Sequence, residues 1–228
     1  MILATHQPIF LPWPGFFYKA GRSECMILLD DVQFPRGRSW LTRNRLKNED
    51  GEMWLTVPVW RKGRGVQIIR QVETYDERGW RRKHLQSIRQ NYVNAPYFEE
   101  YFQIVESIYA RDQRFLVEFN IDMIRFFWDA LSLKTEILLQ SDLGVTGKGT
   151  DLLVKLCKRV GADRLLVFPM VEKHLDPGEM RSHGIDLVCA NFHPPVYPQL
   201  WGEFVYNLST LDLLLNCGSK AKEIVEEA

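Results

Sequence analysis

A histidine and a glutamine directly follow the first apolar segment of the chain. Residues 1–5 form an apolar run that predicts a buried β-strand, and His6-Gln7-Pro8 ends it. A short helix is expected over 16–20. A histidine at such a strand-to-helix connection can stabilise the charge that builds on a bridging phosphate. We therefore predict His6 and Lys19 as catalytic residues and Gln7 as a substrate-binding residue. The alternative is that the His6 ring only caps the turn.

Two adjacent aspartates follow the second apolar segment. Residues 25–29 predict another buried strand, which runs directly into Asp30-Asp31. Because adjacent strand residues point to opposite faces, only one carboxylate can face a given pocket. There it could act as a general base, hold a divalent cation or bind a ribose hydroxyl, so both are predicted catalytic residues. The other is expected to cap or to pair with Arg43 or Arg45. The alternative is that both form structural ion pairs.

Basic and amide side chains in the first half supply candidate ligands for an anion. Arg43-Asn44-Arg45 places two guanidinium groups around an amide, and guanidinium groups bind phosphate or carboxylate through paired hydrogen bonds. The alternative is two arginines that face water on a strand. Lys83-His84 could close over a ligand or form a solvated helix face. The predicted substrate-binding residues of this half are Gln33, Arg43, Asn44, Arg45, Lys83 and His84, besides Gln7.

A proline-rich stretch near the C-terminus holds three further candidates. His193, Tyr197 and Gln199 are interspersed with prolines, which stiffen the backbone and hold polar groups in place without regular structure. We predict that these side chains shape the pocket of an acceptor substrate. Ser209 is expected to cap the following helix, with Asp212 completing an arrangement like a capping box.

Sequence motifs of several enzyme classes are absent. Residues 144–150 resemble a phosphate-binding loop, but that motif requires glycine where Asp142 stands and Ser or Thr where Gly149 stands. We expect a helix capped by Thr150 there instead. G-x-S-x-G, H-E-x-x-H and G-x-G-x-x-G do not occur, which removes most support for serine hydrolases, zinc proteases and dinucleotide-dependent dehydrogenases. No motif indicates a metal site or names a cofactor.

Alternating strands and helices must position these side chains. Further strands are expected over 54–60, 66–72, 135–139, 164–168 and 186–190, and helices over 78–92, 97–109, 113–131, 150–160 and from Ser209. This alternation predicts an α/β fold: a mainly parallel sheet with flanking helices and a central helical insertion at about 78–131, in one domain over 1–228. Ligands bind at the carboxyl ends of parallel strands. His6, Asp30, Asp31 and Pro169 are therefore expected at one rim.

Length and composition indicate an ordinary globular chain. It has 228 residues, of which 46% are hydrophobic and 25% charged. No apolar stretch reaches the roughly 18 residues that cross a membrane, and the N-terminus lacks the basic and apolar regions of a signal peptide. Four scattered cysteines argue against a disulfide scaffold and a structural zinc site. We therefore expect a cytoplasmic protein.

The net charge of zero conceals an asymmetry between the two halves. Up to Val93 there are 16 Lys and Arg against 9 Asp and Glu, and from Asn94 onward 13 against 20. Tryptophans accompany the basic clusters, a combination that holds phosphates together with flat rings and also occurs in nucleic-acid grooves. The alternative is that opposite charges only meet across the fold. A pI near 7 speaks against a dedicated nucleic-acid-binding protein.

Several segments, taken in order, resemble the WbqC-like family. They are HQPIFLPWPGFF (6–17), LDDVQF (29–34), NR (44–45), WLTVP (54–58), KH (83–84), APYF (95–98) and the leucine-rich segment 208–216. The resemblance implies a place in bacterial O-antigen, other surface-polysaccharide or specialised biosynthetic gene clusters, with a group-transfer role. One segment departs from the family. VFPMVEKHLD (167–176) stands where the family tends to carry Ser-Gly and a further glycine, which implies a different substrate or a lost activity.

The sequence thus predicts a transferase with a phosphate-bearing or activated acyl or aminoacyl donor. The acceptor is expected to be a sugar or an amine in polysaccharide or related small-molecule biosynthesis. In this hypothesis His6 and Lys19 stabilise the phosphate, and Arg43 and Arg45 hold its far end. The alternative is a non-catalytic protein that binds nucleic acid or an assembly partner through the basic, aromatic half. An inactive scaffold relative of an enzyme is the third hypothesis. No oligomeric state is predicted.

Overall fold

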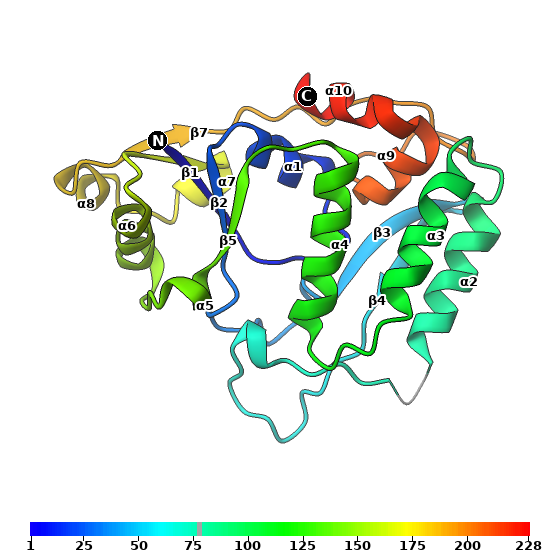
Figure 1. Cartoon of the computed structure of the whole chain (residues 1–228), viewed down its shortest axis with the longest axis horizontal. Coiled ribbons are helices and arrows are strands. Elements are labelled where there is room, and N and C mark those ends of the chain that lie inside the picture. Colours follow the sequence, from blue (N-terminus) through cyan, green and yellow to red (C-terminus); the bar gives the residue numbers. More distant parts are fainter. Residues whose placement is uncertain (77–78) are drawn as a thin grey trace.

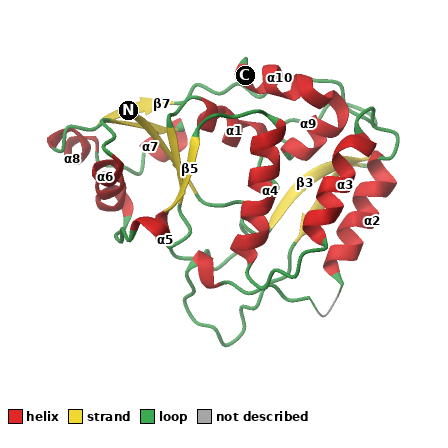
Figure 2. Ribbon diagram, in the orientation of Figure 1, coloured by secondary structure: helices red, strands yellow, loops and turns green. Residues whose placement is uncertain are grey.

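A five-stranded parallel sheet forms the centre of the structure, a computed structural model that describes residues 1–76 and 79–228 (Figures 1 and 2). The strand order is β5-β2-β1-β6-β7. The strands are β1 (Ile2–His6), β2 (Cys25–Leu28), β5 (Glu136–Leu139), β6 (Arg164–Val167) and β7 (Asp186–Cys189). Helices cover both faces of the sheet. The predicted α/β class with a mainly parallel sheet is confirmed.

Side-chain alternation explains why these short strands are almost entirely apolar. Ala4 and Met26 face a core that includes α1 (Pro14–Gly21) and continues to the helices beyond it. Leu3 and Ile27 point the other way, into a second core beneath α6 (Gly149–Val160) and α8 (Pro177–Ser182). A strand that is buried on both faces has no polar side, so its sequence shows no alternation of polar and apolar residues.

A long insertion separates β2 from β5. It begins with an antiparallel hairpin, β3 (Arg43–Asn48) and β4 (Gly51–Thr56), which forms a separate two-stranded sheet. The short 3-10 helix η1 (Ile69–Gln71) lies where a strand over 66–72 was expected, and only an isolated bridge joins Gln33 to Ile68. The helices α2 (Trp80–Tyr92), α3 (Phe98–Tyr109) and α4 (Leu116–Ala130) follow. They confirm the predicted helical insertion, whose expected first residue, Arg78, lies outside the described residues.

The last third of the chain adds short helices. The helices α5 (Gln140–Leu143) and α7 (Pro169–Glu172) follow β5 and β6 directly, whereas α9 (Thr210–Cys217), η2 (Gly218–Lys220) and α10 (Ala221–Glu226) end the chain and pack against α1, α3 and β3. The predicted Thr150 cap of α6 is wrong, because Lys148 is the N-cap residue and the Thr150 hydroxyl accepts a hydrogen bond from the Asp176 backbone. In the described parts of the chain, every helix is too short or too polar to traverse a lipid bilayer.

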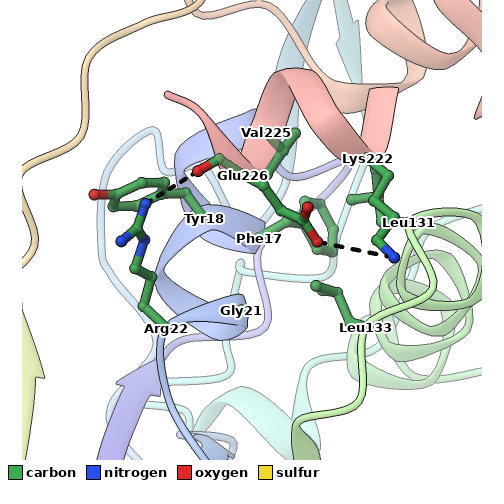
Figure 3. A pocket seen from close by; sticks show the side chains of 9 residues that line it. All are labelled: Phe17, Tyr18, Gly21, Arg22, Leu131, Leu133, Lys222, Val225 and Glu226. Atoms are coloured by element: carbon green, nitrogen blue, oxygen red, sulfur yellow. Dashed lines mark hydrogen bonds and ion pairs between the residues drawn. The ribbon is translucent and has the colours of Figure 1, made fainter. Parts of the chain in front are cut away.

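The C-terminal helix α10 packs against α1, and a shallow hollow remains between them (Figure 3). Arg22 donates a hydrogen bond to the backbone carbonyl of Glu226 at 3.0 Å, and Lys222 lies 3.9 Å from the Glu226 carboxylate. Phe17 and Val225 supply part of the apolar lining. These contacts fasten the end of the chain to the helix that follows β1.

A buried polar network joins the hairpin to the C-terminal part of the chain. Asp212 accepts hydrogen bonds from the hydroxyls of Tyr92 (2.5 Å) and Tyr197 (2.8 Å), and burial raises the pKa of its carboxyl group. Asp212 therefore does not complete the predicted capping arrangement, although Ser209 caps α9 as expected. The Tyr92 hydroxyl in turn accepts a hydrogen bond from the backbone of Lys47.

His84 lies in the core of the insertion, on α2. Its Nδ1 is 3.0 Å from the Tyr109 hydroxyl, and its Nε2 contacts the backbone of Thr56 at 3.1–3.2 Å. The rings of Phe10 and Trp80 pack around it. Burial lowers the pKa of His84 to about 4, so the neutral ring is a structural part of this core.

Two buried amides hold the loop that follows β1. Asn44 of β3 donates to the carbonyls of Phe10 (3.2 Å) and Leu11 (2.6 Å). Asn120 of α4 donates to the carbonyls of Pro8 (2.8 Å) and Leu41 (2.9 Å). Leu11 has a φ of 44°, a left-handed conformation that costs energy for a non-glycine residue. The amides thus fix an irregular loop that could not hold this shape alone.

We expect the Asn120→Ala substitution to lower the free energy of unfolding by about 2–4 kcal/mol. It leaves two buried carbonyls without their donor, and each unsatisfied group costs about 1–3 kcal/mol. Urea denaturation followed by circular dichroism measures this loss. The exposed Asn94→Ala variant is the control and should change stability by less than about 0.5 kcal/mol. A loss below 1 kcal/mol for Asn120→Ala would contradict the role given to this amide.

We expect acid to destabilise the fold partly through His84. Its pKa is about 4 when folded and 6.5 as a free side chain, so the unfolded chain binds the proton more tightly. The free energy of unfolding should therefore fall as the pH drops from 6.5 towards 4, by about 2 kcal/mol between pH 7 and pH 5. Urea denaturation at both pH values should show a smaller fall in His84→Asn. Equal falls in the two proteins would rule out this contribution.

Candidate active site

The sheet reverses its strand order at β1. The chain passes from β1 outward through β2 to β5, and then returns to β6 and β7 on the other side of β1. Loops that leave neighbouring strands in opposite directions open a crevice beyond the carboxyl ends, where α/β proteins bind their ligands. A cleft of about 690 Å³ opens at this point. It is therefore the candidate active site.

Segments far apart in the chain line the cleft. His6 and Gln7 come from the end of β1, Arg38 and Trp40 from the loop before β3, Met170 from α7, and Asn207 from the stretch before α9. Met170 is 77% exposed at this position. It belongs to the segment in which the sequence departs from the family, so the departure lies at the cleft itself.

The His6 ring lines the cleft, is neutral, and has one nitrogen without a hydrogen-bond partner in the described chain. Its Nδ1 lies 2.8 Å from the carbonyl of Gln7. A carbonyl only accepts hydrogen bonds, so Nδ1 carries the proton and Nε2 keeps its lone pair. No described residue is hydrogen-bonded to Nε2. Desolvation and the nearby Lys19 hold the pKa of His6 at about 3, far below its usual value. The ring is therefore neutral in the unliganded site, where Nε2 can accept a hydrogen bond but binds a proton only weakly.

Lys19 lies behind His6, in a position that leaves its amine poorly solvated. It is 3% exposed, and Nζ donates to the carbonyl of Thr5 at 2.6 Å. The ring of Phe168, at the end of β6, is 5.2 Å from Nζ. Burial lowers the pKa of Lys19 to about 7, so the amine is close to half protonated at neutral pH. The predicted pair of His6 and Lys19 is thus brought together at the rim of the sheet.

The charged residues of the cleft are all basic. Arg38 is exposed and has no hydrogen bond or ion pair to any described residue. Arg45 also lines the cleft, but its guanidinium group donates to Glu52 at 2.5 Å and to the backbone carbonyl of Asn207 at 3.2 Å. Among the described residues, no Asp or Glu lines the cleft. The site therefore favours an anionic ligand.

An aromatic wall closes the side of the cleft nearest α1. Trp13 packs against Phe168 and Phe192, with ring centroids 5.4 and 5.0 Å away. Gly15 makes this possible, because a Cβ atom there would lie 2.2 Å from the Trp13 ring. Gly15 therefore allows the Trp13 ring, which lines the cleft, to lie directly against the backbone.

The two aspartates after β2 are bound to structural partners. Asp30 is buried and accepts hydrogen bonds from the backbone and hydroxyl of Ser141, at 2.9 and 2.6 Å, at the start of α5. Asp31 accepts from Arg70 at 2.5 Å, so its predicted pairing with Arg43 or Arg45 is wrong. Neither aspartate is among the residues that line the cleft.

The residues of the predicted Arg43-Asn44-Arg45 group divide between structure and surface. Asn44 lines the cleft, but its side-chain amide donates hydrogen bonds to the loop after β1. Arg45 forms an ion pair with Glu52. The Arg43 guanidinium group stacks 3.6 Å from the ring centre of Trp54 and has no carboxylate partner in the described chain. Strand alternation explains this division, because Arg43 and Arg45 share one face of the hairpin and Asn44 the other.

The remaining predicted substrate-binding residues do not line this cleft. Gln33 and Lys83 are exposed elsewhere on the surface, and His193 is exposed on the proline-rich stretch. Gln199 accepts a hydrogen bond from Lys47 Nζ and donates to a backbone carbonyl, while Tyr197 bonds to the buried Asp212. The predicted acceptor pocket of His193, Tyr197 and Gln199 is therefore not assembled around His6.

Several residues of the site were not predicted from the sequence. Arg38, Trp40 and Met170 line the cleft but were not singled out as ligand-binding residues. The basic segment 35–45 contained a signal for Arg38 and Trp40, because it combines arginines with an aromatic ring. No local pattern marks Met170. Within residues 1–76 and 79–228, no group of three His, Cys, Asp or Glu side chains could hold a metal ion.

Comparisons with known proteins agree with the resemblance seen in the sequence. The family profile described as the WbqC-like protein family matches residues 7–224. An uncharacterised protein of Mycobacterium tuberculosis, Rv1507c, is 30% identical over 223 residues, which cover 97% of this chain and 96% of the relative. No solved structure shows significant similarity to the chain. With a match that spans nearly its full length, the chain belongs to the WbqC-like protein family.

Proposed function

We propose that the protein is a group-transfer enzyme that binds a phosphate-bearing donor in the cleft at the end of β1. One observation carries the proposal: the neutral His6, whose Nε2 has no hydrogen-bond partner among the described residues, lines a cleft whose charged residues in the described chain are all basic. A base next to an anion-binding surface is what transfer from a phosphate leaving group requires. The donor carries a sugar, acyl or aminoacyl group, and the acceptor is a sugar or an amine.

The His6 geometry fits the role of general base once the donor is bound, because the negative charge of the donor raises the pKa of the ring from its low value in the unliganded site. As the hydroxyl or amine of the acceptor attacks, a bond forms to the transferred group and the bond to the leaving phosphate breaks. The proton of the acceptor passes to Nε2, while Nδ1 remains bonded to the Gln7 carbonyl. That second bond fixes the tautomer and the orientation of the ring. His6 therefore moves a proton in this proposal, rather than acting as the cation that the sequence hypothesis assumed.

Arg38 and Lys19 fit the role of stabilising the phosphate. Arg38 is an exposed guanidinium group without a partner in the described chain. Lys19 lies behind His6 and gains a proton readily once negative charge arrives, because its pKa of about 7 is a consequence of burial. An amine that is only half protonated in the unliganded site and becomes fully protonated on donor binding can stabilise the departing phosphate.

The cleft geometry also favours an active protein over an inactive relative. The departing segment 167–176 contributes the apolar Met170 to the rim, while His6, Gln7 and Lys19 remain in place. We propose that this segment changes the substrate rather than removing the chemistry. The biosynthesis of polysaccharide or of a related small molecule, which the family resemblance implies, is the setting that we propose.

The first experiment is a thermal-shift and calorimetric screen of nucleotides, nucleotide-sugars and acyl-CoA thioesters. One donor class should stabilise the protein by about 2.7 kcal/mol at 100 times its dissociation constant. Arg38→Ala should weaken that binding about tenfold or more, because it removes a charge-assisted hydrogen bond. Arg36→Ala is the matched control, since Arg36 is exposed two residues away but does not line the cleft.

With the donor identified, His6→Gln should leave its dissociation constant within a few-fold and lower the transfer rate by about 10²–10⁴. A large loss of transfer rate with little change in the dissociation constant distinguishes a general base from a residue that only binds the donor. Unchanged turnover in a folded His6→Gln protein would remove His6 from the mechanism, and silence of every phosphate-bearing donor would overturn the proposed function.

We expect donor binding at pH 8 to be accompanied by proton uptake. Lys19, with a pKa of about 7, is mostly neutral at that pH, and a bound anion raises its pKa and draws in a proton. Calorimetry in Tris and in HEPES should then give binding enthalpies that differ in proportion to the buffer ionisation enthalpies. Lys19→Met should abolish the difference. Equal enthalpies in both buffers for the wild-type protein would show that Lys19 does not respond to the ligand.

A further inference from the structure

A second compartment adjoins the cleft on the outer side of the hairpin. It has a volume of about 430 Å³ and is lined by Arg38, Ser39, Trp40, Arg43 and Trp54. The first three of these residues also line the cleft, so the two spaces lie next to each other. A ligand that extends from the cleft past Arg38 would reach this compartment.

Two large aromatic rings are exposed in this compartment. Trp40 is 48% and Trp54 42% exposed. Their ring centroids are 5.7 Å apart with an interplanar angle of 30°, so the rings lie nearly parallel. Nearly parallel exposed rings offer a stacking surface for another flat ring, and leaving such surface in water is unfavourable.

Two unpaired cations border the same rings. The Arg43 guanidinium group lies 3.6 Å from the ring centre of Trp54, and its buried Nε has no hydrogen-bond partner. Neither Arg38 nor Arg43 forms an ion pair with a described residue, whereas the neighbouring Arg45 is paired with Glu52. The Arg43 guanidinium group covers part of Trp54, so the flat ring of a ligand would stack on the exposed surface of the two tryptophans that Arg43 leaves free. Guanidinium groups without an ion-pair partner next to that surface match a ligand that combines a flat ring with negative charge.

We propose that the donor is a nucleotide, with its base stacked in the tryptophan compartment and its phosphates along Arg38 towards His6. This inference rests on the proposed function and names the substrate class of the same site. An uncharged sugar would fit less well, because no described carboxylate or amide side chain lines the compartment to accept its hydroxyl hydrogens. Stacking on a ring face is tolerant of base identity, so the compartment recognises the class rather than one base.

Isothermal titration with ADP, UDP and inorganic pyrophosphate tests the inference. The Trp54→Leu substitution should weaken binding of both nucleotides about tenfold or more, the loss expected when one stacked base loses its aromatic partner. Pyrophosphate, which has no base, should bind the variant as it binds the wild-type protein. Trp54→Phe should keep most of the affinity, because it keeps a ring face.

Trp60→Leu is the matched control. Trp60 is 39% exposed and packs edge-on against Tyr75, and it lies outside the compartment. Its substitution should change none of the three affinities. An equal effect of Trp54→Leu and Trp60→Leu would overturn the inference.

The outcomes separate the inference from the proposed function. If pyrophosphate binds in an Arg38-dependent way and the nucleotides bind no more tightly, the base site is wrong and the phosphate site stands. If none of the three probes binds, the inference fails, whereas the proposed function fails only when the whole panel of phosphate-bearing donors is silent. If a ten-residue oligonucleotide binds far more tightly than UDP and its affinity falls steeply with salt, the compartment belongs to a nucleic-acid groove instead.

Discussion

The hydrogen bonds from the amides of Asn44 and Asn120 to the loop after β1 are the constraint on which the site depends. They tie β3 and α4 to a loop that contains a left-handed Leu11. The insertion is therefore more than an addition to the sheet. Its hairpin and its helices hold the chain segment that carries His6 and Gln7 into the cleft.

Charge balance in the site follows from burial. Lys19 and His6 are close enough to depress the pKa of the His6 ring, and desolvation lowers the pKa of both. A neutral His6 and a half-protonated Lys19 leave the site ready for an anion, because the ligand supplies the negative charge that the described lining lacks. Arg38 at the mouth remains charged and exposed. Arg38 can thus attract an anionic ligand, while Lys19 can take up a proton when that ligand binds.

Several polar residues outside the cleft form hydrogen bonds that stabilise the fold. His84, Tyr197 and Asp212 are buried, and each has a hydrogen-bond partner nearby: His84 contacts the Tyr109 hydroxyl, and Tyr197 donates to Asp212. In the sequence such residues look like ligands, because local patterns give residue type but not solvent exposure. Their polar groups are instead used where helices and loops meet, since a buried polar group must find a partner within the protein.

The sequence by itself determined the α/β class, most strand and helix positions, and the placement of His6 and Asp30 at the carboxyl rim. These features follow from apolar runs, helical periodicity and the direction of parallel strands, which are local properties. It did not determine that Asp30 binds Ser141, that Asn44 holds the β1 loop, or that Arg38 stays unpaired. These points depend on the folded chain, because the hydrogen bonds join residues that are 33 to 111 positions apart in the sequence.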